Sequence, residues 1–181
     1  MNLLDENNSI LIVIDVQEKL VAAVNNNTVA DKVSKLVKAA NILNIPVIIS
    51  EQYPKGLGNT VDVVKKSLPQ KTYVQEKTFF SLLKEAGFSD KLKEYNKKQI
   101  VICGIETHIC VYQTATELIN AGFEVVVAKD GCASRNQFEF EQGIEAMKAV
   151  GAKISCLEII LFEWLKSAKH PKFKEVQSLI K

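Results

Sequence analysis

The segment Ser9–Asp15 constrains the fold more than any other part of this sequence. It reads Ile-Leu-Ile-Val-Ile between a serine and an acid, so an extended chain would be apolar on both faces. Such a run is typical of a strand that is covered on both sides in a parallel sheet. Further runs of this kind follow, the second of them weaker than the rest: Pro46–Ser50, Thr72–Gln75, Gln99–Cys103, Glu124–Ala128 and Lys153–Cys156.

Helical patterns lie between these runs. Thr28–Leu43 carries apolar residues at helical spacing, and Thr28 can cap its N-terminus. Cys110–Ala121 and Gln137–Val150 are each followed by a glycine, which favours the end of a helix. Strands that alternate with helices predict an α/β fold, here a three-layer αβα sandwich with a doubly wound, mostly parallel sheet of about six strands. The 181 residues contain no repeat or linker, so we expect a single domain over residues 1–181.

Composition narrows the class of protein. The formal net charge is only +2, and no dense Lys/Arg face is visible, so we expect no nucleic-acid or membrane partner. No apolar run approaches the roughly 20 residues that cross a bilayer, and the N-terminus lacks the features of a signal peptide. The four cysteines form no CxxC pair. A reduced, cytoplasmic protein is therefore expected.

Polar residues follow the predicted strands at one edge of the sheet. In open α/β sheets, ligands bind outside the carboxyl ends of the strands. Asp15 ends the first strand, Lys77 follows the weak third one, and Cys110 follows the fourth by a short segment. We therefore expect a carboxylate, an ammonium group and a thiol to converge.

Cys110 is the candidate nucleophile among them. At the first position of a helix, the unpaired N–H groups would lower the pKa of its thiol and could hold an oxyanion. The alternative is that Cys110 merely packs as a small hydrophobic residue, which is the commoner role of a buried cysteine.

Asp15 and Lys77 each have an ordinary alternative as well. Burial would raise the pKa of Asp15 toward the range of a general base, but an aspartate here can equally cap the helix that follows. Lys77 taken alone would be a solvated lysine. Beside Asp15 it would stabilise the carboxylate and a thiolate electrostatically.

Three segments together carry a family resemblance: Leu11–Gln17, Glu76–Ser81 and above all Gly104–Ala115, which reads Gly-Ile-Glu-Thr-His-Ile-Cys-Val-Tyr-Gln-Thr-Ala. With Asp130–Arg135, they resemble the isochorismatase-like cysteine hydrolases, or nicotinamidase-related superfamily, over about residues 9–160. The resemblance implies a hydrolase that cleaves a small amide or related C–N acyl substrate through a thioester. It places Asp15, Lys77 and Cys110 in the catalytic triad.

The resemblance also implies a cis peptide bond between Ile105 and Glu106. The backbone N–H groups of Glu106 and Cys110 would then form an oxyanion hole, while the Glu106 side chain can point away. A small-molecule substrate and a homo-oligomer are implied in the same way.

The sequence departs from the nicotinamidases where they carry an Asp-x-His metal motif. Ser50–Gly58 contains no histidine, and the chain has only His108 and His170. We therefore expect no metal, no cofactor and no nicotinamidase activity. Cys110 argues against vinyl-ether hydrolysis, because the true isochorismatases lack this nucleophile. Glu51–Thr60 instead resembles the isochorismatase domain-containing proteins of eukaryotes and their bacterial relatives.

Several side chains are candidates for lining the substrate pocket. Each aromatic one among them has core packing as its alternative, and the histidine can also be accessible without a role. The candidates are Gln17, Gln52, Tyr53, Phe79, Phe80 and His108.

Two other classes of protein stay open. One is a non-catalytic scaffold that retains the fold, and the other is a redox-responsive protein in which Cys103 or Cys132 approaches Cys110. The apolar segment Leu157–Trp164 is the candidate oligomer interface, with a core helix as its alternative.

Overall fold

The centre of the molecule is the strand β1 (Ser9–Ile14), all of whose residues are buried. In this computed structural model, which describes residues 2–24, 26 and 28–181, β1 pairs in parallel with β2 on one side and β4 on the other. The double-sided apolar run therefore forms the interior strand that the sequence predicts. The other strands are β2 (Val47–Gln52), β3 (Tyr73–Lys77), β4 (Gln99–Ile105), β5 (Glu124–Ala133) and β6 (Lys153–Ser155).

The strand order is β3-β2-β1-β4-β5-β6, and every pair in the sheet is parallel. The chain winds outward from β1 to β3 and then outward from β4 to β6 on the other side. The direction of winding reverses between β1 and β4, which is where ligands bind in doubly wound sheets. The predicted α/β fold with about six parallel strands is confirmed.

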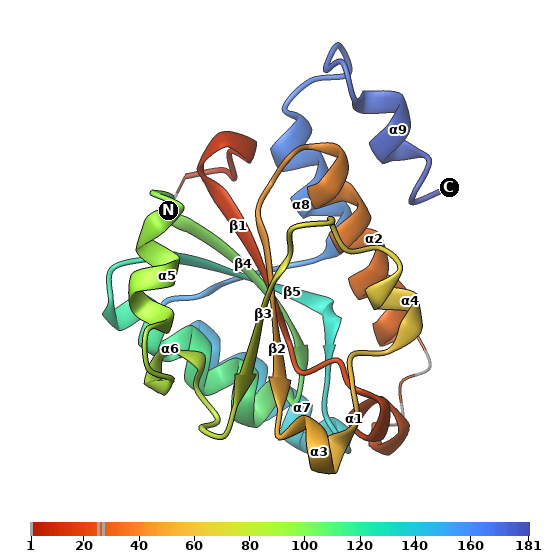
Figure 1. Ribbon diagram of the computed structural model, residues 1–181. Helices are drawn as coiled ribbons and strands as arrows, with labels where there is room; N and C mark the ends of the chain where they lie inside the picture. Colours follow the sequence, from red (N-terminus) through yellow and green to blue (C-terminus); the bar gives the residue numbers. More distant parts are fainter. Residues whose placement is uncertain (1, 25, 27) are drawn as a thin grey trace.

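Helices cover both faces of this sheet (Figure 1). The helices α2 (Val29–Ile42) and α8 (Leu157–Leu165) lie on one face, while α5 (Phe88–Glu94), α6 (Tyr112–Asn120) and α7 (Gln137–Ala149) lie on the other. The three layers match the predicted sandwich. The shorter elements are η1 (Glu6–Asn8), α1 (Glu18–Ala23), α3 (Pro54–Leu57), α4 (Asp62–Lys65), η2 (Leu82–Lys84), η3 (Thr107–Val111) and α9 (Phe173–Gln177).

The segment Leu157–Trp164 is mainly a core helix. Its largest side chain, Trp164, is fully buried, and the indole N–H donates a hydrogen bond of 3.0 Å to Ser9 Oγ. Only Ile159 and Phe162 are exposed large apolar residues within it. The core alternative therefore accounts for this segment better than an oligomer interface does. None of the helices in the described ranges has the length and apolar composition that a bilayer crossing requires.

Two predicted caps are not formed. Thr28 precedes α2, but its hydroxyl bonds to Asn26 Oδ1 at 2.9 Å instead of capping the helix. Asp15 does not cap α1, because the residue at the N-cap position of that helix is Gln17. The carboxylate of Asp15 is therefore available for other contacts.

Close approach of β1 and β4 depends on Gly104. Its φ angle is +133°, and a Cβ atom at this position would collide with the backbone of Ile14. The chain can therefore leave β4 beside the end of β1 only because residue 104 has no side chain. This brings the segment that carries Cys110 next to Asp15.

Candidate active site

Asp15 leaves β1 in the left-handed region, with a φ angle of +50°. Its carboxylate is directed to β2, where Ser50 Oγ donates a hydrogen bond of 2.6 Å to Oδ1. The backbone N–H of Asp15 also donates to the carbonyl oxygen of Ser50, at 3.2 Å. Asp15 has no exposed surface and Ser50 is only 1% exposed, so both contacts are shielded from water.

Lys77, the last residue of β3, supplies the counter-charge. Its Nζ lies 2.7 Å from Asp15 Oδ2, and neither side chain is exposed. The ammonium group also donates to Gln52 Oε1 and to the carbonyl oxygens of Phe79 and Phe80. Oδ2 of Asp15 therefore faces a full positive charge, while Oδ1 accepts the Ser50 hydroxyl.

The pKa of Asp15 is raised above its ordinary value of 3.8, chiefly because burial disfavours the charged carboxylate. The charge of Lys77 and hydrogen bonds from Lys77, Ser50 and Cys110 act in the opposite direction. A buried carboxylate with a raised pKa binds a proton more readily than an exposed one. Asp15 is therefore suited to act as a base.

Cys110 is buried in η3 and interacts with both members of the Asp15–Lys77 pair. Burial raises the pKa of its thiol to about 12, and the negative charge of Asp15 adds to this effect while Lys77 opposes it. The prediction of a lowered pKa is therefore wrong for the free protein. The helical segment begins at Thr107 and not at Cys110, so the thiol is not at its positive end.

The peptide bond between Ile105 and Glu106 is cis, as the family resemblance implies. The Glu106 side chain faces Arg135, whose Nε lies 3.0 Å from Oε1, and its Oε2 also accepts from the Arg135 backbone N–H at 3.3 Å. The Glu106 carboxylate is thus bound to Arg135 in the loop between β5 and α7. The oxyanion hole formed by the N–H groups of Glu106 and Cys110 stays a prediction.

Gly143 of α7 lets the helix lie directly against η3. A Cβ atom at this position would come within 2.8 Å of the Cα and N atoms of His108. It would also lie 3.0 Å from the carbonyl carbon of Thr107. The backbone that carries Cys110 is therefore placed by close contact with a helix more than thirty residues further along the chain.

Gln17 and Gln52 are joined to each other and to the backbone. The Gln17 amide donates to the carbonyl oxygens of Gln52 and Gly58 and accepts from the Gln52 N–H at 2.7 Å. Gln52 in turn accepts from Lys77 and donates to the Thr78 carbonyl. These contacts link both glutamines to the Lys77 ammonium group, and their place in the lining of a substrate pocket stays a prediction.

The candidate aromatic residues are on the surface near Lys77. Tyr53, Phe79 and Phe80 are each more than half exposed, so core packing does not account for them. Tyr53 begins the turn into α3 with a φ angle of +38°. Phe79 and Phe80 also contribute the carbonyl oxygens that bind Lys77, so their backbone has a role that their sequence does not indicate.

His108 bonds to the loop after β5. Its Nδ1 lies 2.9 Å from Ser134 Oγ, and its Nε2 lies 3.9 Å from Glu139 Oε2. Ser134 and Arg135 thus both contact the segment before the nucleophile. Both residues belong to Asp130–Arg135, one of the segments that resemble the family, but no sequence pattern indicates these contacts.

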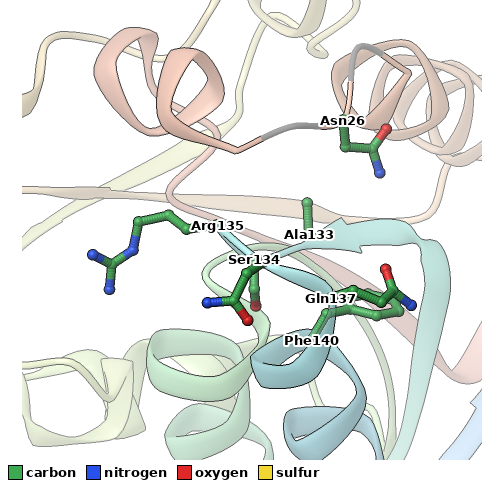
Figure 2. Close-up of a pocket in the computed structure, with 7 residues that line it drawn as sticks. Asn26, Ala133, Ser134, Arg135, Gln137 and Phe140 are labelled. Atoms are coloured by element: carbon green, nitrogen blue, oxygen red, sulfur yellow. The ribbon is translucent and has the colours of Figure 1, made fainter.

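A cavity of about 380 Å³ adjoins this loop (Figure 2). In the close-up, Asn26 faces the β5–α7 loop across the cavity, and the Arg135 side chain extends to one side. A second cavity, of about 230 Å³, is bordered by Lys77 and Tyr53 on the β3 side. The first cavity is lined by Asn26, Ala133, Ser134, Arg135, Asn136, Gln137 and Phe140.

Within the described part of the chain, no three His, Cys, Asp or Glu side chains are grouped so that they could hold a metal ion. At the carboxyl end of β2, Ser50 and Gln52 bind Asp15 and Lys77 directly. The arrangement thus offers a paired base and cation and a thiol whose pKa responds to both, all three buried.

Comparison with known proteins places this geometry in a family. The isochorismatase domain matches residues 9–159. Isochorismatase domain-containing protein 2 of Xenopus laevis is 38% identical over 178 residues, which cover 98% of this chain and 85% of that protein. MAR1 ribonuclease from Caenorhabditis elegans has a similar structure, with a TM-score of 0.93 and 36% identity over 98% of this chain and 91% of that chain. Nicotinamidase PncA from Bacillus subtilis has a TM-score of 0.70 and 21% identity over 82% and 99% of the two chains.

These similarities identify the class of protein as isochorismatase-like, with the fold of the nicotinamidase hydrolases. The chain belongs to the isochorismatase domain family, and the resemblance seen in the sequence is confirmed.

Proposed function

We propose that this protein is a cysteine-nucleophile hydrolase that cleaves a small amide or related C–N acyl substrate through a thioester. The observation that carries the proposal is the buried Asp15–Lys77 ion pair, together with the buried Cys110, whose pKa responds to both members of the pair. A thiol that interacts out of water with a carboxylate and an ammonium group suits nucleophilic catalysis.

Attack on the substrate is coupled to proton transfer. Because the pKa of Cys110 is about 12, the thiol is protonated at neutral pH in the free protein. Asp15 Oδ2 accepts this proton as sulfur bonds to the acyl carbon, and the positive charge of Lys77 stabilises the anionic groups. The backbone N–H groups of Glu106 and Cys110 hold the oxyanion in the proposed scheme.

Asp15 then transfers its proton to the leaving group, and a proton from water finally restores the Cys110 thiol. Asp15 donates the proton to the leaving nitrogen as the C–N bond breaks, which releases an amine or ammonia and leaves a thioester on Cys110. Water gives a proton to Asp15 and attacks the thioester. The acid product leaves, and the proton returns to the sulfur.

One cavity has a volume that supports a small-molecule substrate. The volume of about 380 Å³ beside the β5–α7 loop lies in the range of small-ligand pockets, whereas the 230 Å³ beside Lys77 lies below that range. One cavity adjoins the loop that contacts His108, and the other adjoins Lys77 and the exposed Tyr53. We propose that Tyr53, Phe79 and Phe80 contact substrate, while His108 assists in orienting it.

We further propose a cytoplasmic homo-oligomer. Phe138 of α7 is 71% exposed and provides apolar surface that a second copy can cover. Light scattering on the purified protein tests the oligomeric state. A mass of at least twice 20.1 kDa supports a homo-oligomer, and a mass of 20.1 kDa contradicts it.

The direct test is a panel of small amides and carbamoyl compounds assayed with wild type, Cys110→Ala and Asp15→Asn. Turnover by wild type that is lost in both variants supports the proposal. A substrate that Cys110→Ala hydrolyses at the wild-type rate contradicts it. RNA belongs in the same panel, because the Caenorhabditis elegans relative is named a ribonuclease.

A scaffold or a redox-responsive protein is the alternative. Cys103 and Cys132 are buried on the adjacent strands β4 and β5, and burial raises the pKa of both thiols. Neutral buried thiols react slowly with oxidants, which argues against Cys103 or Cys132 as a redox partner of Cys110.

A further inference from the structure

Ser50 contacts Asp15 in two ways, although its own chemistry plays no part in the proposed reaction. Its carbonyl oxygen accepts the Asp15 N–H at 3.2 Å, and its hydroxyl donates to Oδ1 at 2.6 Å. Both residues are inaccessible to solvent, or almost so, so water does not compete for either bond. One residue thus fixes both the backbone and the side chain of the proposed base.

The backbone conformation explains why such a double contact is needed. Ser50 pairs with Ile14 in the parallel register of β1 and β2, so Asp15 is the next residue beyond the ladder. There the chain turns into the left-handed region at a φ angle of +50°, which few non-glycine residues adopt. Without the Ser50 hydroxyl, the direction of the carboxylate would depend on its contacts with Lys77 and Cys110 alone.

Side chains along β2 alternate between the two faces of the sheet, so neighbouring residues have different partners. Residues two apart on a strand face the same side of the sheet. Ser50 and Gln52 accordingly bind Asp15 and Lys77, whereas the intervening Glu51 accepts from the N–H and hydroxyl of Thr60.

We propose that Ser50 is a positioning residue, which favours the ionised, proton-accepting form of the Asp15 carboxylate and fixes its orientation beside Lys77. The inference rests on the proposed role of Asp15 as the base. It assigns Ser50 no contact with substrate.

The sign of the effect follows from the groups that face Asp15. These are Lys77 from β3, Cys110 from η3 and the neutral Ser50 from β2. A hydroxyl that donates to a carboxylate stabilises the charged form and lowers its pKa. Loss of the hydroxyl therefore raises the pKa of Asp15, so the base becomes available only at higher pH.

The test needs no knowledge of the substrate. Iodoacetamide alkylation of Cys110 is followed by peptide-resolved mass spectrometry from about pH 4 to about pH 10, in wild type, Asp15→Asn, Ser50→Ala and Ser50→Gly. In wild type the rate should rise with pH as Asp15 ionises, and Asp15→Asn should lack this step. In both Ser50 variants, the midpoint of this pH-dependent rise should lie about one pH unit higher than in wild type. A shift of this size is expected when a carboxylate loses one hydrogen bond.

Two controls separate positioning from general structural damage. Ser50→Thr retains the hydroxyl and should restore the wild-type midpoint. Ser34→Ala removes an equally buried hydroxyl, bonded to Ser67 Oγ at 2.8 Å away from the site, and should leave the midpoint unchanged.

The outcomes distinguish the two levels of the proposal. If the alkylation rate of wild type rises with pH and the midpoint of this rise is the same in Ser50→Ala and Ser50→Gly, the role of Ser50 is overturned. Asp15 then remains the proposed base. A wild-type profile that matches that of Asp15→Asn overturns both.

Discussion

The Nζ atom of Lys77 lies 2.7 Å from Oδ2 of Asp15, and neither side chain is exposed to solvent. Burial raises the pKa of Asp15, and the Lys77 charge limits that rise. The pair joins the last residue of β3 to the residue after β1, with β2 between them. A site of this kind combines poor solvation of the base with a positive charge that favours its ionised form.

Replacement of Lys77 by methionine should destabilise the protein. The change keeps the apolar volume but leaves Asp15 as an unpaired buried charge. We expect the free energy of unfolding at neutral pH to fall by about 3–5 kcal/mol, the cost of breaking a buried pair. Urea denaturation of wild type and Lys77→Met measures this loss.

The loss should shrink on acidification. A carboxyl group whose pKa is raised in the folded state favours folding at pH values below its unfolded pKa, and this contribution is lost as pH rises through the folded pKa. Without Lys77 the folded pKa of Asp15 rises further, so protonation relieves more of the deficit. Lys66→Met, which removes the exposed pair with Asp62, should change stability by less than about 1 kcal/mol at any pH. Equal losses in the two variants would contradict the account.

Substitution of Gly143 by alanine should impair the nucleophile despite better helix propensity. Propensity alone would stabilise α7 by about 1 kcal/mol. The added Cβ atom would instead lie 2.8 Å from the backbone of His108 and displace η3. We expect the rate of Cys110 alkylation, or of turnover once a substrate is known, to fall about 10- to 100-fold.

The adjacent Gln142 provides the control for Gly143. It is exposed on the same helix, so Gln142→Ala tests helix propensity without contact with η3. Its alkylation rate should equal that of wild type. If Gly143→Ala reacts as fast as Gln142→Ala, then α7 does not position Cys110.

The buried thiol of Cys132 should make stability fall at alkaline pH. Burial raises its pKa from 9.0 to about 12 in the folded protein. Its contribution to stability is therefore fully present below pH 9 and is lost between pH 9 and pH 12. The slope should approach about 1.4 kcal/mol for each pH unit. Urea denaturation of wild type and Cys132→Ala across this range measures the difference, and parallel losses in the two proteins would refute it.

The sequence predicts the interior strands well because burial on both faces leaves a continuous apolar run. Ser9–Asp15 is such a run, and β1 covers all but its last residue. The outer parts of strands are harder to predict. β2 continues through the polar Glu51 and Gln52 because they pair with Glu76 and Lys77 of β3, and no local pattern reveals that pairing.

The sequence predicts which side chains form the candidate site, but it predicts their pKa values and hydrogen-bond partners less well. The apolar strand before Asp15 indicates burial, and hence a raised pKa, without a structure. The pKa of Cys110 lies in the direction opposite to the prediction, because burial and the Asp15 charge raise it. The helical turn also begins three residues before Cys110, so the thiol is not at its positive end. Gln17 carries an amide that can bind either a ligand or the backbone, and only the fold brings Gly58 and Gln52 to it.

The central claim is that Cys110 forms a thioester, and intact-protein mass spectrometry during turnover tests it most directly. With a hydrolysed substrate from the amide panel, rapidly quenched wild-type protein should gain the mass of the acyl group on the peptide that contains Cys110. Hydroxylamine should remove it, and Cys110→Ala should neither gain the mass nor turn over. Sustained hydrolysis by Cys110→Ala at the wild-type rate, with no adduct on the wild-type protein, would contradict the account.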